Sequence, residues 1–299
     1  MSTVGLVGLG SMGYGMGRSL LRAGLTVHGF DLAPEQVARF EAEGGRGGAL
    51  AEVAGALDAL VLVVVNAEQM ATVLFGESGV AAALKPGALV LGCATVAPAA
   101  ARDFEQRLGE AGLLYLDAPI SGGAAKAAEG ALTMMASGSP QAFAAAEPLL
   151  EAMAATVFRL GDTAGPASAM KMVNQLLAGV HIAAAAEAMT FGMTQGVAPA
   201  DCLRVISQCA GSSWMFENRG PHIAEGDYRP RSAVEIFVKD LGIVSDIARA
   251  ARFSAPLSAA ALQQFLAASG LGLGREDDAA VAKVYARNAG LTLPGEEGG

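Results

Sequence analysis

The sequence predicts an α/β fold with a doubly wound, mostly parallel sheet, followed by an all-helical C-terminal domain. Three observations support this prediction. Short apolar runs alternate with helical patterns in the first half of the chain, a glycine-rich turn follows the first run, and the strand pattern stops near residue 164. Alternation of this kind is typical of a sheet built from βαβ units.

Five apolar runs are expected to form the strands of the sheet. They lie at residues 4–10, 26–31, 58–65, 87–94 and 113–119. The segments between them are long enough for the helical crossovers that parallel strands require. The run ALVLVVV contains almost only valine and leucine, which indicates a central strand buried on both faces.

The remainder of the chain is expected to be helical. We predict an N-terminal domain over residues 1–163, a helical domain over 164–290 and a frayed tail over 291–299. A long apolar helix begins the second domain and joins it to the first. Loops are expected at 210–232 and 270–277, where glycine, proline and polar residues gather.

Composition and charge exclude several classes of function. The 299 residues carry a formal net charge of −9, and the pI is about 4.9, so a nucleic-acid partner is not expected. We see no signal peptide and no charge-free apolar run long enough to cross a membrane. The three cysteines form no CxxC pair. These features favour a soluble cytoplasmic protein with reduced thiols.

The glycine-rich turn has the spacing of a dinucleotide-binding loop. Gly8, Gly10 and Gly13 form GxGxxG between the first strand and the first helix, with Ser11 and Met12 inside the motif. In a Rossmann fold these glycines permit a tight turn, close approach of a pyrophosphate, and close packing of helix on strand. The alternative is a structural turn without a ligand.

An acidic residue ends the second expected strand. Asp31 is placed to accept hydrogen bonds from the ribose 2′-hydroxyl of NAD and to repel the 2′-phosphate of NADP. The residues that follow, LAPEQ, contain no arginine to bind that phosphate. NAD is therefore the predicted cofactor. The alternative is that Asp31 only caps the helix that starts near Pro34.

Two further polar residues follow later strands. Asn66 and Thr95 lie where the carboxyl ends of the third and fourth strands are expected, which is where ligands bind in open α/β sheets. We interpret both as candidate contacts to the nicotinamide or its ribose. Either residue is also a plausible helix N-cap.

The long apolar helix contains an unexpected pair of polar residues. Lys171 and Asn174 lie three residues apart in the stretch SAMKMVNQLLAGVHIAAAAEAM, so they project from one face of the helix. Burial lowers the pKa of a lysine, and a nearby cation lowers it further. A neutral lysine accepts a proton from a substrate hydroxyl. The alternative is a lysine whose stem is buried and whose tip reaches water.

Four stretches together resemble the β-hydroxyacid dehydrogenase family, which contains 3-hydroxyisobutyrate dehydrogenase and tartronate semialdehyde reductase. They are GLGSMG, DAPISGGAAKAAEGALTMMASG, KMVNQ and FVKDLG, and they extend from residue 5 to 242. Longer stretches, including SSWMFENRGPHIAEGDYRPRSAVEIFVKDLG, resemble the branch of this family that oxidises L-threonate.

The resemblance implies a role for each matching residue. Lys171 is the implied catalytic residue, and Asn174 its companion at the substrate. Ser121, Gly122 and Gly123 are implied to bind the substrate carboxylate. Lys239 is implied to lie near the nicotinamide, with Asp240 beside it.

The expected function is NAD-dependent oxidation of a small sugar acid. L-Threonate is the best single candidate, with 3-hydroxyisobutyrate and tartronate semialdehyde as alternatives. A non-catalytic dinucleotide-binding scaffold is the rival from another class. The scattered histidines predict no metal site. The stretch from Trp214 to His222 holds either recognition residues or packing residues, and the apolar helix indicates a homodimer or homotetramer.

Overall fold

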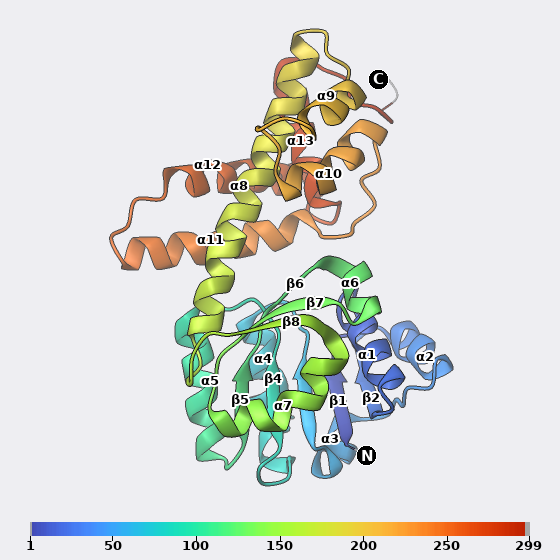
Figure 1. The fold of residues 1–299 in the computed structure, drawn as a ribbon, viewed down its shortest axis with the longest axis vertical. Helices are drawn as coiled ribbons and strands as arrows, with labels where there is room; N and C mark the ends of the chain where they lie inside the picture. The colour runs from blue at the N-terminus through green and yellow to red at the C-terminus, as the bar shows by residue number, and fades with distance from the viewer. Residues whose placement is uncertain (1, 297–299) are drawn as a thin grey trace. The chain divides into compact units, whose positions relative to one another are not determined.

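The computed structural model describes residues 2–296. The chain divides into two compact units, Met1–Lys171 and Met172–Gly299. The helix α8 (Pro166–Thr194) crosses the boundary between them. Figure 1 shows the helices and strands of each unit.

The first unit contains the predicted parallel sheet. Its five strands are ordered β2-β1-β3-β4-β5, and all neighbouring pairs are parallel. The strands are β1 (Thr3–Val7), β2 (Thr26–Phe30), β3 (Ala59–Leu62), β4 (Leu89–Gly92) and β5 (Leu114–Asp117). The strand order reverses direction between β1 and β3, which makes this position the topological switch point of the sheet. The predicted fold class is confirmed.

Helices cover both faces of this sheet, because its central strands are apolar on both faces. In β3, the side chains of Ala59 and Val61 pack on one face, and those of Leu60 and Leu62 pack on the other. The helices and 3₁₀ turns of this part are α1 (Gly13–Arg22), α2 (Pro34–Ala42), α3 (Leu50–Val53), η1 (Ala54–Ala56), α4 (Ala67–Phe75), η2 (Ala81–Ala83), α5 (Pro98–Glu110), α6 (Gly123–Glu129) and α7 (Pro140–Met153). Helices α1 and α7 contribute to the first core, and α4 and α5 contribute to the second.

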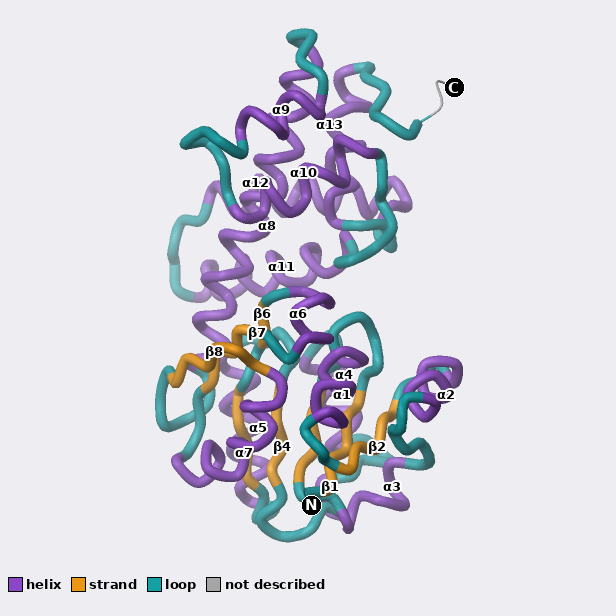
Figure 2. The backbone as a smooth tube through the Cα atoms, turned by 45° about the vertical axis from the view of Figure 1, so that its right-hand side comes forward, coloured by secondary structure: helices purple, strands orange, loops and turns teal. Residues whose placement is uncertain are grey.

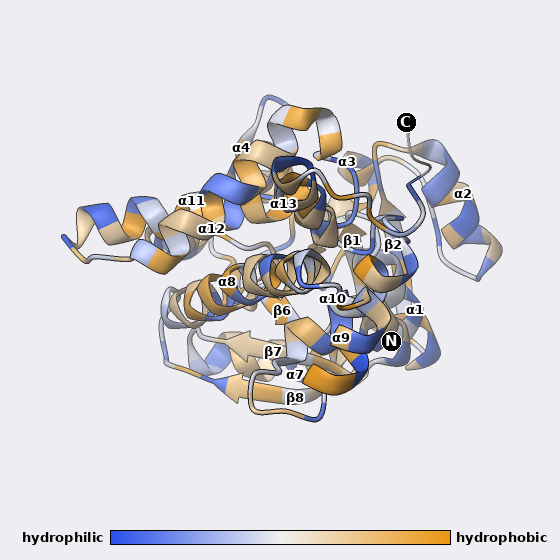
Figure 3. Cartoon of the chain, turned by 90° about the horizontal axis from the view of Figure 1, so that it is seen from above, coloured by the Kyte–Doolittle hydropathy of each residue, from blue (hydrophilic) through white to orange (hydrophobic). Residues whose placement is uncertain are grey.

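A second, three-stranded sheet was not predicted. It consists of β6 (Ile120–Ser121), β7 (Leu132–Ala136) and β8 (Ala154–Arg159), in the order β6-β7-β8. Strand β6 has only two residues, and β8, although apolar in sequence, is mostly exposed. The colouring by hydropathy shows β7 and β8 as apolar strands and α2 as mostly hydrophilic (Figure 3).

The carboxylate of Asp117, at the end of β5, anchors the start of α8. Its Oδ2 accepts hydrogen bonds from the backbone N–H groups of Gly165 and Ser168, both at 3.0 Å, and its Oδ1 accepts one from the Ser168 hydroxyl at 2.7 Å. Asp117 is fully buried. Burial raises its pKa above the usual value, and these hydrogen bonds oppose the rise. The first turn of α8 is thereby attached to the parallel sheet.

Within residues 172–296, the described chain is helical and forms no named strand (Figure 2). Its elements after α8 are α9 (Pro199–Ile206), α10 (Trp214–Glu225), α11 (Val234–Ala250), α12 (Pro256–Ala268), the π-helical turn η3 (Ser269–Leu273), η4 (Asp278–Ala280) and α13 (Val281–Ala289). A single apolar core that includes Phe216, Phe237 and Phe265 joins these helices to α8.

The loops expected in the second unit need correction. Residues 210–232 contain helix α10, which begins after the N-cap Ser213 and continues through Pro221. The glycines and prolines of this stretch indicated a loop, but the apolar side chains of Phe216 and Ile223 pack into the core as one helical face. The 270–277 stretch is partly the turn η3.

The expected tail is also partly ordered. Leu293 is 2% exposed and belongs to the core of the second unit, and Leu291 packs against the same core. Residues 297–299 lie outside the described part of the chain.

Helix α8 is long and apolar enough to cross a bilayer by length and composition alone. The same properties are found in the core helices of soluble proteins, and 44% of its most apolar window is buried inside the protein. The helix also carries the charged residues Lys171 and Glu187.

We expect Asp117→Ala to lower the free energy of unfolding by about 2–5 kcal/mol, because it leaves buried N–H groups of the α8 first turn without an acceptor. Urea unfolding followed by circular dichroism measures the loss. Asp162→Ala is the matched control, because Asp162 is an exposed carboxylate just before the same helix and pairs with Arg159. That control should cost no more than about 1 kcal/mol. Equal effects of the two substitutions would contradict the anchoring role.

Candidate active site

The glycine-rich loop has the geometry that its motif predicts. Gly8 has a φ of +96°, and a Cβ built on it would lie 2.4 Å from the carbonyl oxygen of Val63. A Cβ on Gly13 would lie 1.8 Å from the carbonyl oxygen of Gly8. Only glycine fits at both positions. The loop therefore packs closely against the chain that follows β3, at the topological switch point.

The same loop leaves space where a pyrophosphate is expected to approach. Gly10 is exposed, and no described atom lies within 4 Å of a Cβ built on it. Ser11 is exposed, and Met12 is the N-cap of α1, with no side-chain cap from the described residues. An open helix N-terminus of this kind suits a phosphate group. These residues fit the dinucleotide that the motif implies.

Asp31 is tied to the glycine-rich loop. Its Oδ2 accepts a hydrogen bond from the backbone N–H of Leu9 at 2.7 Å, and its Oδ1 accepts one from Ala33 at 2.9 Å. The N-cap of α2 is Ala33, so Asp31 does not occupy the capping position. Each carboxylate oxygen has two lone pairs, which leaves acceptor capacity for ribose hydroxyls.

Asn66 and Thr95 follow β3 and β4, at the edge of the sheet where the glycine-rich loop lies. Asn66 is the N-cap of α4, and its Oδ1 accepts a hydrogen bond from the backbone N–H of Gln69 at 2.8 Å. In this structure the side-chain oxygen of Asn66 therefore serves as the N-cap of α4. Thr95 is half-buried and precedes Ala97, the N-cap of α5, so Thr95 is not a cap.

Ser121, Gly122 and Gly123 form the turn between β6 and α6. Gly122 has a φ of +135° and Gly123 a φ of +81°. Both values lie in the left-handed region that favours glycine. The turn thus bends in a way that side chains at these two positions would oppose.

Lys171 is buried beside this turn. Lys171 is only 7% exposed, and its Nζ donates a hydrogen bond to the carbonyl oxygen of Ile120 at 2.9 Å. The amine of Lys171 therefore does not extend into bulk water, which was the alternative for this residue. Ile120 directly precedes Ser121, so the structure brings the lysine to the start of the Ser121–Gly123 turn.

Asn174 belongs to a chain of polar side chains in the second unit. Its Nδ2 donates to Oε1 of Gln175 at 2.9 Å, and Nε2 of Gln175 donates to Oδ2 of Asp240. The Nζ of Lys239 lies 2.7 Å from Oδ1 of Asp240. Sequence reasoning did not single out Gln175. The signal available in the sequence was a glutamine within an apolar helix, next to Asn174.

In the stretch from Trp214 to His222, Phe216 and His222 are buried, whereas Trp214 and Asn218 are exposed. Arg219 Nη2 donates to Asp278 at 2.9 Å, and His222 Nδ1 lies 2.8 Å from Asp277. Both aspartates are fully buried. Burial raises the pKa of Asp278; burial also opposes ionisation of Asp277, but the hydrogen bond from His222 holds the pKa of Asp277 below its usual value. The Arg219–Asp278 ion pair and the His222–Asp277 contact connect α10 to the turn before α13.

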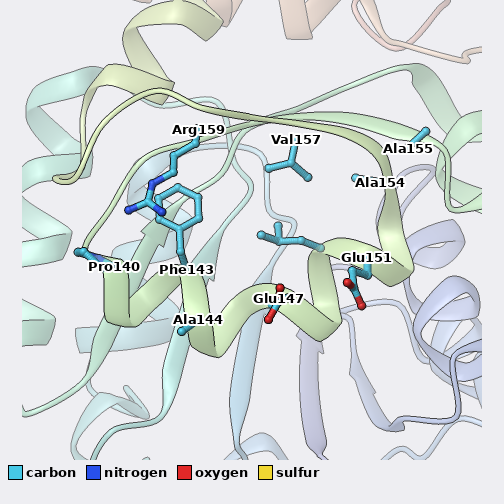
Figure 4. A pocket seen from close by; sticks show the side chains of 10 residues that line it. Pro140, Phe143, Ala144, Glu147, Glu151, Ala154, Ala155, Val157 and Arg159 are labelled. Atoms are coloured by element: carbon cyan, nitrogen blue, oxygen red, sulfur yellow. The ribbon is translucent and has the colours of Figure 1, made fainter.

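A groove of about 510 Å³ lies elsewhere on the first unit (Figure 4). It is lined by α7 and β8, including Phe143, Glu147, Val157 and Arg159. The residues predicted to bind the cofactor and substrate do not line it. The groove is therefore separate from the candidate site.

Known proteins resemble this chain over nearly its full length. Residues 3–161 match the NAD binding domain of 6-phosphogluconate dehydrogenase, and residues 165–285 match the NAD-binding domain of NADP-dependent 3-hydroxyisobutyrate dehydrogenase. An L-threonate dehydrogenase of Cupriavidus necator is 54% identical, and the alignment covers 98% of each chain.

Two further relatives support the same assignment. An NAD-dependent L-serine dehydrogenase of Pseudomonas aeruginosa is 32% identical, with 95% of this chain and 98% of that protein aligned. A crystal structure of a 3-hydroxyisobutyrate dehydrogenase from Salmonella typhimurium has a TM-score of 0.91 and 51% identity, and covers 95% of this chain and all of that one. The chain therefore belongs to the β-hydroxyacid dehydrogenase family of NAD-dependent oxidoreductases, as its motifs predict.

Proposed function

We propose that this protein oxidises L-threonate to its 2-oxo acid, with NAD as the hydride acceptor and Lys171 as the general base. The observation that carries the proposal is the burial of Lys171 with its Nζ hydrogen-bonded to Ile120, beside the Ser121–Gly123 turn. The 54% identity to an L-threonate dehydrogenase supports the choice of substrate.

The cofactor is assigned to the residues of the glycine-rich loop. Backbone N–H groups from Gly8 to Gly13 bind the pyrophosphate, and Asp31 binds the adenine ribose. A carboxylate at this position repels the additional phosphate of NADP, which favours NAD. Thr95 and Asn66 contribute contacts near the nicotinamide end, and the match of FVKDLG to the family motif assigns Lys239 to the same end. When bound, the nicotinamide supplies the carbon that accepts the hydride.

Lys171 moves the proton of the reaction. A neutral amine has two N–H donors and one lone pair, and burial favours this uncharged form. One N–H remains bonded to the carbonyl oxygen of Ile120, which fixes the position of Nζ. The lone pair takes the proton of the substrate hydroxyl, and a bound nicotinamide would accept the hydride from the C–H bond of the same carbon. In the reverse direction, the ammonium returns that proton to the forming alkoxide.

The substrate is positioned by polar groups of the Ser121–Gly123 turn and α8. The backbone and the Ser121 hydroxyl bind its carboxylate. Asn174, three residues after Lys171 on α8, contacts its hydroxyls. Carboxylate binding is common to the whole family, so contacts to the additional hydroxyls distinguish a sugar acid from simpler hydroxy acids.

A second candidate substrate is 3-hydroxyisobutyrate, because the Salmonella typhimurium structure with 51% identity carries that name. Tartronate semialdehyde is a third candidate from the same family. A dinucleotide-binding scaffold without catalysis is disfavoured by the presence and burial of Lys171.

We also propose that the protein is a cytoplasmic homodimer or homotetramer. Residues 1–163 serve as the NAD-binding domain, and 164–290 serve in substrate binding and oligomerisation. Helix α8 carries exposed apolar side chains at Met170, Val173, Leu177 and Phe191. Exposed apolar side chains along one helix are typical of a subunit interface. Sedimentation of the purified protein tests this proposal, and a monomeric mass would contradict it.

The first prediction concerns substrate and cofactor. Formation of NADH should be faster with L-threonate than with D-threonate, D-erythronate, 3-hydroxyisobutyrate, glycerate or serine. NAD should support turnover at least about tenfold better than NADP, because Asp31 repels the 2′-phosphate. A preference for 3-hydroxyisobutyrate would keep the mechanism and overturn the substrate assignment. Equal use of NADP would contradict the role of Asp31.

The second prediction concerns the general base. We expect Lys171→Met to reduce kcat by about a hundredfold to ten-thousandfold, because the lone pair that accepts the proton is lost. NADH binding, measured by fluorescence, should stay within about twofold of the wild-type value. Lys85→Met is the matched control, since Lys85 is partly exposed and pairs with Asp58, at the start of β3 and away from the carboxyl ends of the strands where the site lies. Full turnover by Lys171→Met would refute the assignment.

A further inference from the structure

We propose that Gln175 and Asp240 are positioning residues that fix the direction of the Asn174 amide, so that Asn174 presents its carbonyl oxygen to a substrate hydroxyl. This inference rests on the proposed function and identifies how the second unit orients its contact to the substrate. The four residues involved all lie within this unit: Asn174, Gln175, Lys239 and Asp240.

The geometry forms a directed chain of hydrogen bonds. Asn174 donates from Nδ2 to Oε1 of Gln175, and Gln175 donates from Nε2 to Oδ2 of Asp240. Gln175 is 7% exposed and Asp240 is 1% exposed, so water has little access to either group. Asn174 is half-buried and lies at the more accessible end of the chain.

The carboxylate determines the direction of this chain. An ionised aspartate accepts hydrogen bonds but cannot donate them. Asp240 therefore requires the NH₂ group of Gln175, which turns the Gln175 carbonyl oxygen toward Asn174. That oxygen in turn requires the NH₂ group of Asn174. The carbonyl oxygen of Asn174 is then left to accept a hydrogen bond from a hydroxyl group.

Asp240 also has a cationic partner. Its second oxygen lies 2.7 Å from Nζ of Lys239, the preceding residue on α11. In this ion pair the carboxylate of Asp240 faces an ammonium group, which donates hydrogen bonds and accepts none. The ion pair thus keeps the direction of the hydrogen-bond chain defined.

Stability alone does not account for a buried polar chain of this kind. Buried ion pairs and amides contribute little beyond what apolar residues of similar volume would contribute. The neighbouring positions of α8 and α11, Ala178 and Leu241, are apolar and belong to the core. The polar side chains at positions 175 and 240 are explained if they orient the amide of Asn174.

An exchange of the two side chains tests the proposal. Asp240→Asn introduces an amide that can also donate a hydrogen bond. The side-chain amide of Gln175, and then that of Asn174, can therefore rotate by 180° and exchange the positions of its oxygen and nitrogen. Gln175→Glu places two carboxylates in contact, and their repulsion moves the group at 175 away from its position beside Asn174. The double variant Q175E/D240N restores a group at 175 that only accepts, and again requires the NH₂ group of Asn174. It also keeps the net charge of the wild-type protein.

Two measurements report the effect. The first is kcat/KM with L-threonate and NAD. The second is the affinity of L-threonate for the protein saturated with NADH, measured by calorimetry, which involves no chemical step. We expect each single variant to lose about tenfold or more in both measurements, and the double variant to return to within about threefold of the wild type.

The outcomes separate orientation from structural support. Asp246→Asn is the matched control for charge, because Asp246 is exposed on the same helix and pairs with Arg249; it should leave both measurements unchanged. Thermal unfolding identifies any variant that fails to fold. A double variant that folds but is no better than the worse single variant would overturn the proposal. So would single variants with wild-type kcat/KM and affinity.

Failure of the proposed function is distinguishable from failure of this inference. If the wild-type protein prefers another hydroxy acid, both measurements are made with that acid, and the same recovery is expected. If the wild-type protein oxidises no hydroxy acid, the proposed function and this inference are both wrong. If the wild-type protein is active and the exchange does not restore activity, only this inference is wrong.

Discussion

The position of the proposed catalytic lysine depends on one buried carboxylate. Asp117 ends β5 and accepts hydrogen bonds from the first turn of α8, at Gly165 and Ser168. Lys171 follows one turn later and reaches the carbonyl oxygen of Ile120, three residues after Asp117 in the chain. The parallel sheet, the helix and the Ser121–Gly123 turn are therefore connected through the short segment from the end of β5 to β6. A shift of this anchor would move the lysine relative to the turn.

Polar residues in α8 are explained by the partners that each unit provides. In the first unit, the ammonium or amine of Lys171 has a backbone carbonyl beside it. In the second, Asn174 and Gln175 lead to the Asp240 carboxylate. A buried polar group is costly unless it is hydrogen-bonded, so these partners are required for the helix to carry such residues. The same helix supplies the apolar side chains of Ile182, Ala186 and Met189 to the core of the second unit.

The main sheet and the glycine-rich loop could be predicted from the sequence because their signals are local. The valine-rich run at β3 and the GxGxxG spacing depend on neighbours in the chain. Strand β6 could not be predicted, since two residues form no pattern. Helix α10 was mistaken for a loop, because its glycine and proline residues obscured an apolar face that only tertiary packing reveals. The partners of Arg219 were missed for a similar reason, since Asp278 lies far away in sequence.

The pH dependence of the reaction in both directions tests the central claim most directly. Oxidation requires neutral Lys171, and reduction requires its ammonium form. If one lysine performs both steps, kcat/KM for oxidation should rise with pH and kcat/KM for reduction should fall, with the same apparent pKa in the two profiles. Profiles that change in the same direction, or that persist unchanged when Lys171 is replaced by methionine, would contradict this account.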